Sequence, residues 1–452
     1  MWRAVAAAVS SLTTRGRCLL GTGVALLAVG VVLGERALVQ AAVFVLALPV
    51  IAALAIARQR FSVTSRRTVS PSRVPRGADA EVLLELANTD RRAGGVWLLS
   101  EGLPAELGEQ PRFVVDRLPA GATSGMRYRV HGSRRGRHVL GPLQLRLVDP
   151  FGLVRRTVSG TDTVPLLVVP RVRPLGAGGP AGGSGGRGEG ARRSIAVHGE
   201  DDVSAREYRH GDDLRKVHWR ATARTGELMV RLEERPWRSS ATLLLDTRAR
   251  AHLLAGGRAG APAPAGPEGD PTPPPDSLEW VVEAAASIGT ALLRRGALLR
   301  VVTDEGDLTA SGRVGVGPEE LLDRLALLTP SRAPGLGTAV ERVARVAGDG
   351  PVVCLLGAVG ADEVADLARV RSGPTTDVAV LADVASWADA GAVRSRRGIS
   401  TASRDELARQ REEAARLLSS AGWRVVVAGV TTRLEDVWAS LGTPTGGLGV
   451  PA

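Results

Sequence analysis

The stretch Arg206-Glu-Tyr-Arg-His-Gly-Asp-Asp-Leu-Arg-Lys-Val-His-Trp-Arg-Ala-Thr-Ala-Arg-Thr-Gly-Glu-Leu-Met-Val-Arg-Leu-Glu-Glu234 divides the chain into two parts with different sequence patterns. It contains Lys216, the only lysine of the chain, and Tyr208, one of its two tyrosines. It also collects ring-bearing side chains of types that are rare elsewhere, namely His210, His218 and Trp219. This concentration predicts a segment with a role of its own, and we call residues 194–239 the signature segment.

Downstream of the signature segment, residues 240–452 alternate short apolar runs with amphipathic stretches. Buried strands spaced by helices are typical of a parallel sheet that is covered by helices on both faces. The expected strands are 241–246, 297–303, 351–356, 377–381 and 423–430. The expected helices are 277–295, 318–328, 338–346, 361–370, 404–421 and 434–441. An insert at 256–276, rich in proline, glycine and alanine, predicts a disordered loop.

Upstream, residues 61–173 contain short apolar runs separated by turn signals, a pattern typical of a small antiparallel β-sandwich. A glycine-rich linker at 174–193 follows, and we interpret it as a flexible spacer because it lacks the strand–loop–helix context of phosphate-binding loops. The run Asp149-Pro-Phe-Gly-Leu153 predicts a turn in which Phe151 fills the core and Gly152 permits an unusual backbone angle. The expected strand runs are 81–87, 112–116, 126–131 and 138–148.

Two uncharged apolar runs at 18–34 and 37–57 predict a transmembrane helical hairpin within residues 1–60. As helices these runs would measure roughly 26 and 32 Å, close to the hydrocarbon thickness of a bilayer. Arginines precede the first run and follow the second, so the positive-inside rule places both ends and the bulk of the chain in the cytoplasm. A cleaved signal peptide leaves the second run unexplained. We therefore expect a plasma-membrane protein with two membrane-spanning helices.

The net charge of +11 comes almost entirely from arginine. Arginine in place of lysine fits a G+C-rich, actinobacterial-type coding bias as well as a need for bidentate contacts, so it indicates an anionic partner only weakly. The hydrophobic content of 44% allows sizeable cores. Cys18 and Cys354 lie far apart in apolar runs, which predicts neither a disulfide framework nor a cysteine metal site.

The signature segment resembles a bacterial family known only as domain of unknown function fifty-eight. The order of hairpin, β region, Asp-Pro-Phe-Gly-Leu run and signature segment agrees with that family as well. His210 is a departure, because the family often has proline before Gly-Asp. The resemblance rests on an ordered series: Arg206, Tyr208, Gly211-Asp-Asp213, Arg215, His218-Trp219 and Ala223-Arg224.

This resemblance implies a C-terminal domain similar to a von Willebrand factor A domain. Such domains often hold a divalent cation through an Asp-x-Ser-x-Ser loop after the first strand and a distant threonine. Asp246 takes the first position here and Thr338 would take the threonine position, but Arg248 and Arg250 replace the two serines. Cationic side chains repel a metal ion and supply no oxygen ligand, so we expect a degenerate site without metal.

The resemblance also implies partners, namely a MoxR-type AAA+ ATPase and a transglutaminase-like membrane protein. The role that it implies is that of an accessory factor in the assembly or maturation of other proteins. We expect no cofactor.

The charges of the signature segment are mixed, which favours internal ion pairs over a surface patch of one sign. One interpretation is a polar clasp in which Asp212 and Asp213 cap a helix or bind arginines, with Trp219 buried beneath them. Such a clasp would form a docking surface for a protein partner, the function that we favour. The residues expected to bind that partner are Arg206, Tyr208, Gly211, Asp212, Asp213, Arg215, His218, Trp219 and Arg224.

Two alternatives stay open for the same segment. His218 with Asp212 or Asp213 would form a base and its orienting acid, but neither a nucleophile motif nor a metal-ligand set accompanies them. A basic arm of this kind would also bind phosphates of nucleic acid, and the interleaved acids argue against that. We therefore assign no catalytic residue and expect docking rather than catalysis.

Overall fold

The computed structural model describes residues 12–58, 63–91, 96–149, 151–176, 205–207, 219–231, 240–254, 274–309, 316–347, 350–370, 377–392 and 400–442. These residues form two compact units, one up to Val169 and one from Pro170 onward. The predicted linker beyond Gly176 and the predicted insert up to residue 273 lie outside the described residues.

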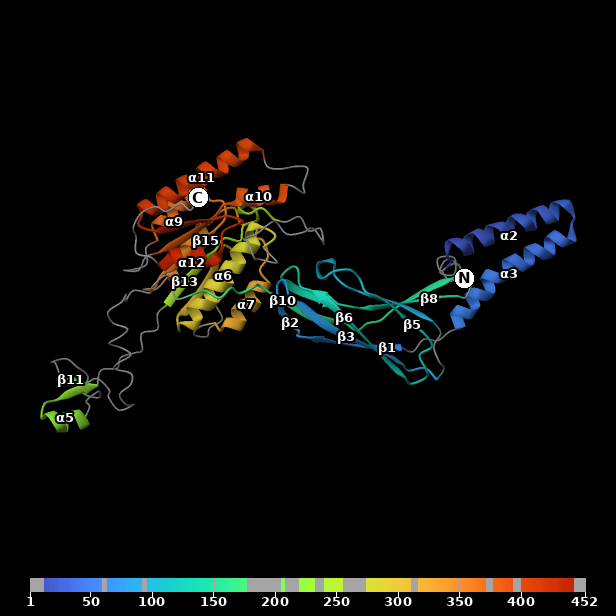
Figure 1. The fold of residues 1–452 in the computed structure, drawn as a ribbon, viewed down its shortest axis with the longest axis horizontal. Helices are drawn as coiled ribbons and strands as arrows, with labels where there is room; N and C mark the ends of the chain where they lie inside the picture. The colour runs from blue at the N-terminus through green and yellow to red at the C-terminus, as the bar shows by residue number, and fades with distance from the viewer. Residues whose placement is uncertain are drawn as a thin grey trace. The chain divides into compact units, whose positions relative to one another are not determined.

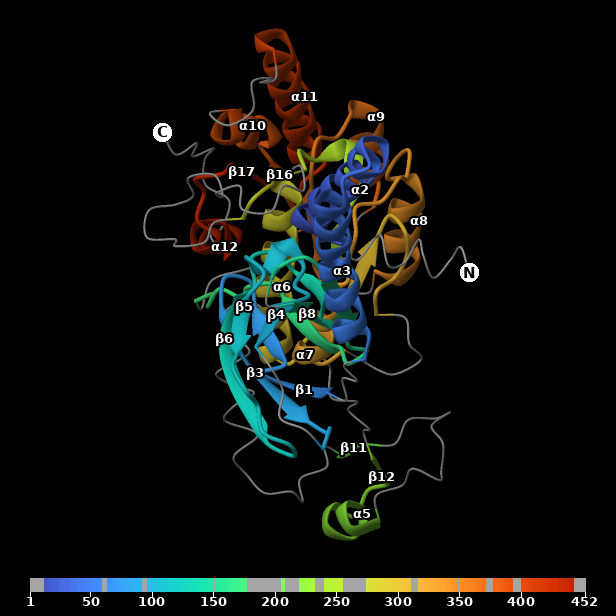
Figure 2. The same ribbon diagram turned by 90° about the vertical axis from the view of Figure 1, so that its right-hand side faces the viewer.

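The first unit begins with two helices, α2 (Thr14–Leu33) and α3 (Arg36–Arg58), which run side by side in Figure 1 and overlap in the view of Figure 2. Thr13 caps α2, since its side chain accepts a hydrogen bond from the backbone N–H of Gly16. Both helices are long and apolar enough to span a membrane, and only 17% of each apolar window is buried. The predicted pair of long apolar helices is therefore confirmed, although the cap starts α2 four residues earlier than expected.

Glycines at seven-residue intervals bring α2 close to α3. Gly23 and Gly30 are buried in α2. A Cβ atom on Gly23 would lie 2.7 Å from the side chain of Leu46, and one on Gly30 would lie 3.0 Å from that of Leu38. Small residues at such positions let two helix backbones approach, so this spacing determines how the hairpin packs.

Most other described residues of the first unit lie in short strands and their connections, with sheets ordered β1-β3-β6, β2-β10-β7 and β5-β4-β8-β9. Neighbouring strands are antiparallel except for the parallel pair β2 and β10. The strands are β1 (Val63–Ser70), β2 (Arg73–Pro75), β3 (Asp79–Asn88), β4 (Trp97–Glu101), β5 (Arg112–Val115), β6 (Thr123–His131), β7 (Gly136–Leu140), β8 (Leu143–Val148), β9 (Arg155–Ser159) and β10 (Val164–Val169).

Strand β3 organises the core of this β module, because its alternate residues are buried. Val82 belongs to a hydrophobic cluster with Leu166 of β10, whereas Leu84 belongs to a second cluster with Leu145 of β8. The expected antiparallel sheets are thus confirmed. The predicted strand at 138–148 is two strands, because Gly141, with φ of +93°, and the following proline interrupt it.

The second unit contains a five-stranded parallel sheet ordered β14-β13-β15-β16-β17. Its strands are β13 (Ser240–Leu245), β14 (Leu298–Thr303), β15 (Val352–Leu356), β16 (Val378–Ala382) and β17 (Arg424–Ala428). Its helices are α6 (Ser277–Arg294), α7 (Pro318–Ala326), α8 (Gly337–Val346), α9 (Ala361–Ala368), α10 (Val384–Ala392), α11 (Thr401–Ser420) and α12 (Leu434–Gly442). The predicted parallel sheet with alternating helices is confirmed, and α10 is an additional helix.

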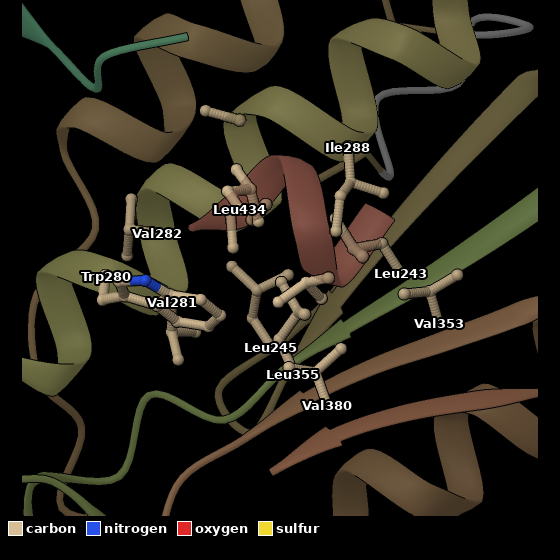
Figure 3. Packing of buried hydrophobic residues seen from close by; sticks show 14 of the residues in the cluster. Leu243, Leu245, Trp280, Val281, Val282, Ile288, Val353, Leu355, Val380 and Leu434 are labelled. Atoms are coloured by element: carbon tan, nitrogen blue, oxygen red, sulfur yellow. The ribbon is translucent and has the colours of Figure 1, made fainter. Parts of the chain in front are cut away.

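Successive side chains of β13 point to opposite faces of this sheet, and helices cover both faces. Leu243 and Leu245 pack in one cluster with residues of α6, α7, α10 and α12, as Figure 3 shows for α6 and Leu434. Leu244 packs in the other cluster with residues of α8, α9 and α11. In Figure 1, α9 and α11 accordingly lie on the opposite side of the sheet from α6 and α7.

The chain enters the second unit along α6 and α12. The backbone N–H of Arg173 donates to Ser287 Oγ at 3.0 Å. The carbonyl oxygen of Gly176 accepts from Trp438 Nε1 at 2.9 Å and from Arg295 at 3.0 Å. The first residues of the predicted linker are therefore held on the α/β unit.

Candidate functional site

The strand order of the second unit places a topological switch point between β13 and β15. The chain passes from β13 to β14 on one side, and β15 then lies on the other side of β13. Open parallel sheets bind ligands in the crevice at the carboxyl ends of the strands that flank such a point. Asp246 directly follows β13, and Gly357 directly follows β15. These two positions therefore mark where a ligand or metal site would be expected.

The guanidinium of Arg248 occupies this position, and the residue has no exposed surface. Its Nε donates to Asp246 Oδ1 at 2.8 Å and a terminal nitrogen donates to Oδ2 at 2.9 Å, which is a bidentate pair. Its other terminal nitrogen is ion-paired with Glu363 Oε1. Burial alone would lower the pKa of Arg248, but hydrogen bonds and charge from the two carboxylates raise it above the ordinary value.

Glu363 of α9 is the residue that sequence reasoning missed. Its Oε2 accepts from the backbone N–H of Gly360 at 3.2 Å, and its Oε1 also accepts from Arg250 at 3.2 Å. Both arginines that replace serine in the Asp-x-Ser-x-Ser pattern thus converge on one carboxylate. The sequence signal for Glu363 was its position in the first turn of a helix that follows a glycine. No local pattern links Glu363 to Arg248.

Backbone and side-chain donors fix Asp246 from its other sides. The N–H of Gly357 donates to Asp246 Oδ2 at 3.2 Å. His252 Nε2 donates to the carbonyl oxygen of Asp246 at 2.8 Å, and its Nδ1 lies 3.1 Å from Ser277 Oγ. Because a carbonyl only accepts, Nε2 carries the hydrogen and Nδ1 accepts from the hydroxyl. Burial lowers the pKa of His252, which keeps the ring neutral.

A second buried network holds the residue between Asp246 and Arg248. Asp304, which follows β14, accepts from the backbone N–H of Thr247 at 2.8 Å and from its hydroxyl at 2.6 Å. The hydroxyl of Ser331 donates to the other oxygen of Asp304. The loop after β13 is therefore fixed to both neighbouring strand ends.

The side chains around Asp246 do not fit a divalent cation, because the Arg248 guanidinium already engages the carboxylates that would bind the ion. Thr338, expected at the threonine position, is exposed in the first turn of α8. Within the ranges that the structure covers, no group of three or more His, Cys, Asp or Glu side chains is placed to hold a metal.

The described part of the signature segment forms a small β-α-β element of β11 (Ala205–Glu207), α5 (Trp219–Thr225) and β12 (Met229–Arg231). Arg206 of β11 lies opposite Val230 of antiparallel β12. Thr222 Oγ1 accepts from the backbone N–H of Met229 at 3.0 Å, which joins α5 to β12.

Trp219 begins α5 and is 70% exposed. The expectation that it is buried beneath a clasp is therefore wrong in the folded chain. Arg224, near the end of the same helix, is also exposed. The other predicted binding residues lie outside the described residues, so the clasp stays a prediction: Tyr208, Gly211, Asp212, Asp213, Arg215 and His218.

Residues 204–255 match the model of a family described as a protein of unknown function, DUF58. The matched span includes both the β-α-β element with Trp219 and the loop that carries Asp246 and Arg248. No curated protein sequence matches the chain.

Solved structures resemble parts of the chain at low similarity. A CARDB domain from Pyrococcus furiosus is 13% identical, covering 25% of this chain and 98% of that one, with a TM-score of 0.19. The alkylpurine DNA glycosylase AlkC from Pseudomonas fluorescens is 16% identical over 28% of this chain and 40% of that one, with a TM-score of 0.15. β-Glucosidase 3B from Thermotoga neapolitana is 15% identical over 24% of this chain and 17% of that one, with a TM-score of 0.12. Scores this low carry no argument about function.

Proposed function

We propose that the chain is a membrane-anchored scaffold that binds a protein partner through its signature segment. The observation that carries this proposal is the exposed indole of Trp219 within the span that the family model matches. Tryptophan and arginine are enriched among the residues that dominate protein–protein binding energy. An exposed Trp219 with Arg224 on the same short helix is such a combination.

The buried Arg248 at the switch point of the α/β unit favours docking over metal-dependent chemistry. A von Willebrand factor A-like module is the interpretation that we propose for this unit, since its strand order and its Asp246 loop agree with one. In this module the Arg248 guanidinium takes the place of a cation between Asp246 and Glu363. The unit would then act as a rigid support for the signature segment.

The membrane anchor in this proposal is the hairpin of α2 and α3. Arg15 and Arg17 lie at the start of α2, and Arg58 ends α3. The positive-inside rule then places both ends of the hairpin in the cytoplasm. The β module and the α/β unit would consequently work at the inner face of the plasma membrane.

The partner that the family resemblance suggests is a MoxR-type AAA+ ATPase, with a transglutaminase-like membrane protein as a further member of the complex. The corresponding role is assembly or maturation of other proteins. Affinity capture with mass spectrometry would identify the proteins that are assembled or matured.

Binding of the full chain to a purified MoxR-type ATPase, with and without ATP, tests the proposal. Trp219→Ala should weaken binding by roughly 30-fold or more, the effect of losing a residue worth about 2 kcal/mol. Leu327→Ala is the matched control, because Leu327 is 57% exposed in the α/β unit and outside the signature segment. Binding of the Asp212→Ala variant, measured in the same assay, tests whether the predicted clasp contributes to the affinity.

Equal binding by the wild-type chain and the Trp219→Ala variant would refute the docking assignment. Failure of the ATPase to bind the wild-type chain, with Trp219-dependent capture of a different protein, would refute only the identity of the partner.

A further inference from the structure

The loop between β8 and β9 has a fixed shape with one exposed aromatic side chain. We call residues Asp149 and 151–154 the β8–β9 loop. The buried carboxylate of Asp149 accepts from the backbone N–H groups of Phe151 at 2.9 Å and Val154 at 2.6 Å. Gly152 has φ of +68°, which an L side chain rarely adopts. Phe151 is 67% exposed while Leu153 is buried, so the expectation that Phe151 fills the core is wrong.

This loop is bound to the start of the membrane hairpin. The backbone N–H of Thr13 donates to the carbonyl oxygen of Leu153 at 2.9 Å, and its hydroxyl donates to that of Gly152 at 2.6 Å. Leu12 and Val154 form an antiparallel bridge. A Cβ atom on Gly16 would collide with the Leu153 carbonyl, so only glycine permits this approach at the first turn of α2.

Apolar contacts extend the attachment to both helices. Leu153 and Val154 form a buried cluster with Leu12 and with Ala52 of α3. Partly buried side chains from the hairpin pack against this cluster: Leu19, Leu20, Leu48 and Ala53. The loop therefore sits at the end of the hairpin where the chain enters α2 and leaves α3.

The surroundings of Phe151 fit the surface of a bilayer. The apolar span of α2 begins at Thr14, and the loop contacts the residues on either side of that point. Arg15 and Arg17 lie at the start of α2, and Arg155 directly follows the loop in sequence. All three residues are exposed. Phenylalanine is among the apolar side chains that anchor interfacial segments, and arginine attracts anionic headgroups.

We propose that Phe151 inserts into the interface of an anionic bilayer beside the hairpin, so that the β8–β9 loop sets the depth at which the β module sits. The inference rests on the membrane anchoring proposed above. Lipid is the occupant that we choose because the loop that carries Phe151 is packed on the start of the apolar span. The apolar face of an interfacial helix is buried roughly 5–10 Å into the boundary of headgroups and acyl chains, and we expect a comparable depth for Phe151.

Site-specific fluorescence in the full chain tests the inference. In a Cys18→Ala background, Phe151→Cys would be labelled with an environment-sensitive nitrobenzoxadiazole dye and reconstituted into phosphatidylcholine–phosphatidylglycerol vesicles. Cys354 has no exposed surface, and burial raises the pKa of its thiol, so it should stay unlabelled. Val139→Cys is the control, because Val139 is exposed and lies on β7. Strand β7 leads into the start of β8, and the length of β8 separates that start from the loop by roughly 20 Å.

The expected result is blue-shifted emission at position 151 with strong quenching by a shallow spin-labelled lipid, and neither effect at position 139. Removal of phosphatidylglycerol should reduce the quenching at position 151. Alkaline extraction of the same vesicles reports insertion of the hairpin independently. Equal, weak quenching at both positions in a chain that resists extraction would overturn the inference and leave the anchoring intact. A chain that alkali extracts would overturn both.

Discussion

Arg248 occupies the place where a parallel sheet of this order usually receives its ligand. A buried charge is costly unless it is paired and fully hydrogen-bonded. Asp246 supplies the bidentate partner two residues away, and Glu363 supplies the second carboxylate from α9. The three side chains therefore stabilise the fold only as a set, and they tie the loop after β13 to the loop after β15.

Replacing Arg248 by methionine should lower the free energy of unfolding by about 3–5 kcal/mol, because Asp246 would be left buried without its countercharge. Urea unfolding of the full chain in detergent, followed by tryptophan fluorescence, measures the change. Arg250→Ala is the matched control, since the exposed Arg250 contacts the same Glu363 and should cost less than about 1 kcal/mol. Equal losses in the two variants would contradict a structural role specific to Arg248.

The same geometry predicts a gain of metal binding. In an Arg248→Ser, Arg250→Ser variant, Asp246 and Glu363 would face each other without a guanidinium, and hydroxyl oxygens would join them. Oxygen ligands of this kind suit Mg²⁺. Millimolar Mg²⁺ should therefore raise the melting temperature of the variant but not that of the wild-type chain. No Mg²⁺-dependent shift in the variant would show that the guanidinium does not stand in a cation's place.

His252 makes the α/β unit sensitive to acid. Its folded-state pKa is lowered below 6.5, chiefly by burial, so the unfolded chain binds a proton at a higher pH than the folded chain does. The stability that depends on neutral His252 is therefore fully present above about pH 6.5. It is lost as the pH falls toward and through the folded-state pKa. His252→Gln keeps a donor toward Asp246 without titrating.

The stability lost between about pH 7.5 and 5.5 should be smaller in His252→Gln than in the wild-type chain. Urea unfolding at the two pH values measures this difference. The same pH dependence in both chains would exclude His252 as the source.

Single residues show where sequence reasoning stopped. The expectation that Arg248 and Arg250 exclude a metal needs only their charge and spacing, and it stays a prediction. Glu363 could not be paired with Arg248, because the contact spans 115 positions and depends on how α9 docks. Trp219 was expected beneath the polar clasp and Phe151 in the core, and neither lies in a repeating pattern that would define an inward face.

The element that depends most on backbone approach is the α2–α3 hairpin. Gly23→Leu should disturb it, because the first added carbon already falls 2.7 Å from Leu46. Overpacking of this kind costs about 1–3 kcal/mol. Amide hydrogen exchange of residues 14–58 in detergent should accordingly become faster by roughly tenfold.

Gly21→Leu provides the control in the same helix. A Cβ atom on Gly21 meets nothing within 4 Å, so this variant adds the same side chain to an open face. Its exchange should match that of the wild-type chain. Equal acceleration in both variants would mean that the glycine spacing does not determine the packing of the hairpin.

Elements with a strong periodic pattern were predictable, and irregular ones were not. The five parallel strands consist mostly of apolar residues, and helices such as α6 repeat their apolar residues at helical spacing. The run 138–148 reads as one strand until the backbone angle of Gly141 is known. The small β11-α5-β12 element gives no such signal, since its strands have only three residues each.

For the molecule as a whole, each part of the chain has a different proposed role. Two long apolar helices contact the β module through the β8–β9 loop, and a parallel sheet with Arg248 buried at its switch point follows the signature segment. Composition and periodicity predicted the order of these parts. They could not predict the attachment of the loop to the hairpin, because Thr13 and Leu153 meet across 140 positions.

The most direct measurement of the proposed docking role is photo-crosslinking from position 219 of the full chain in native membranes. A photoreactive amino acid in place of Trp219 should form one dominant adduct with a protein partner, and the same amino acid in place of Leu327 should not. The absence of an adduct from position 219, or the same set of adducts from both positions, would contradict the account.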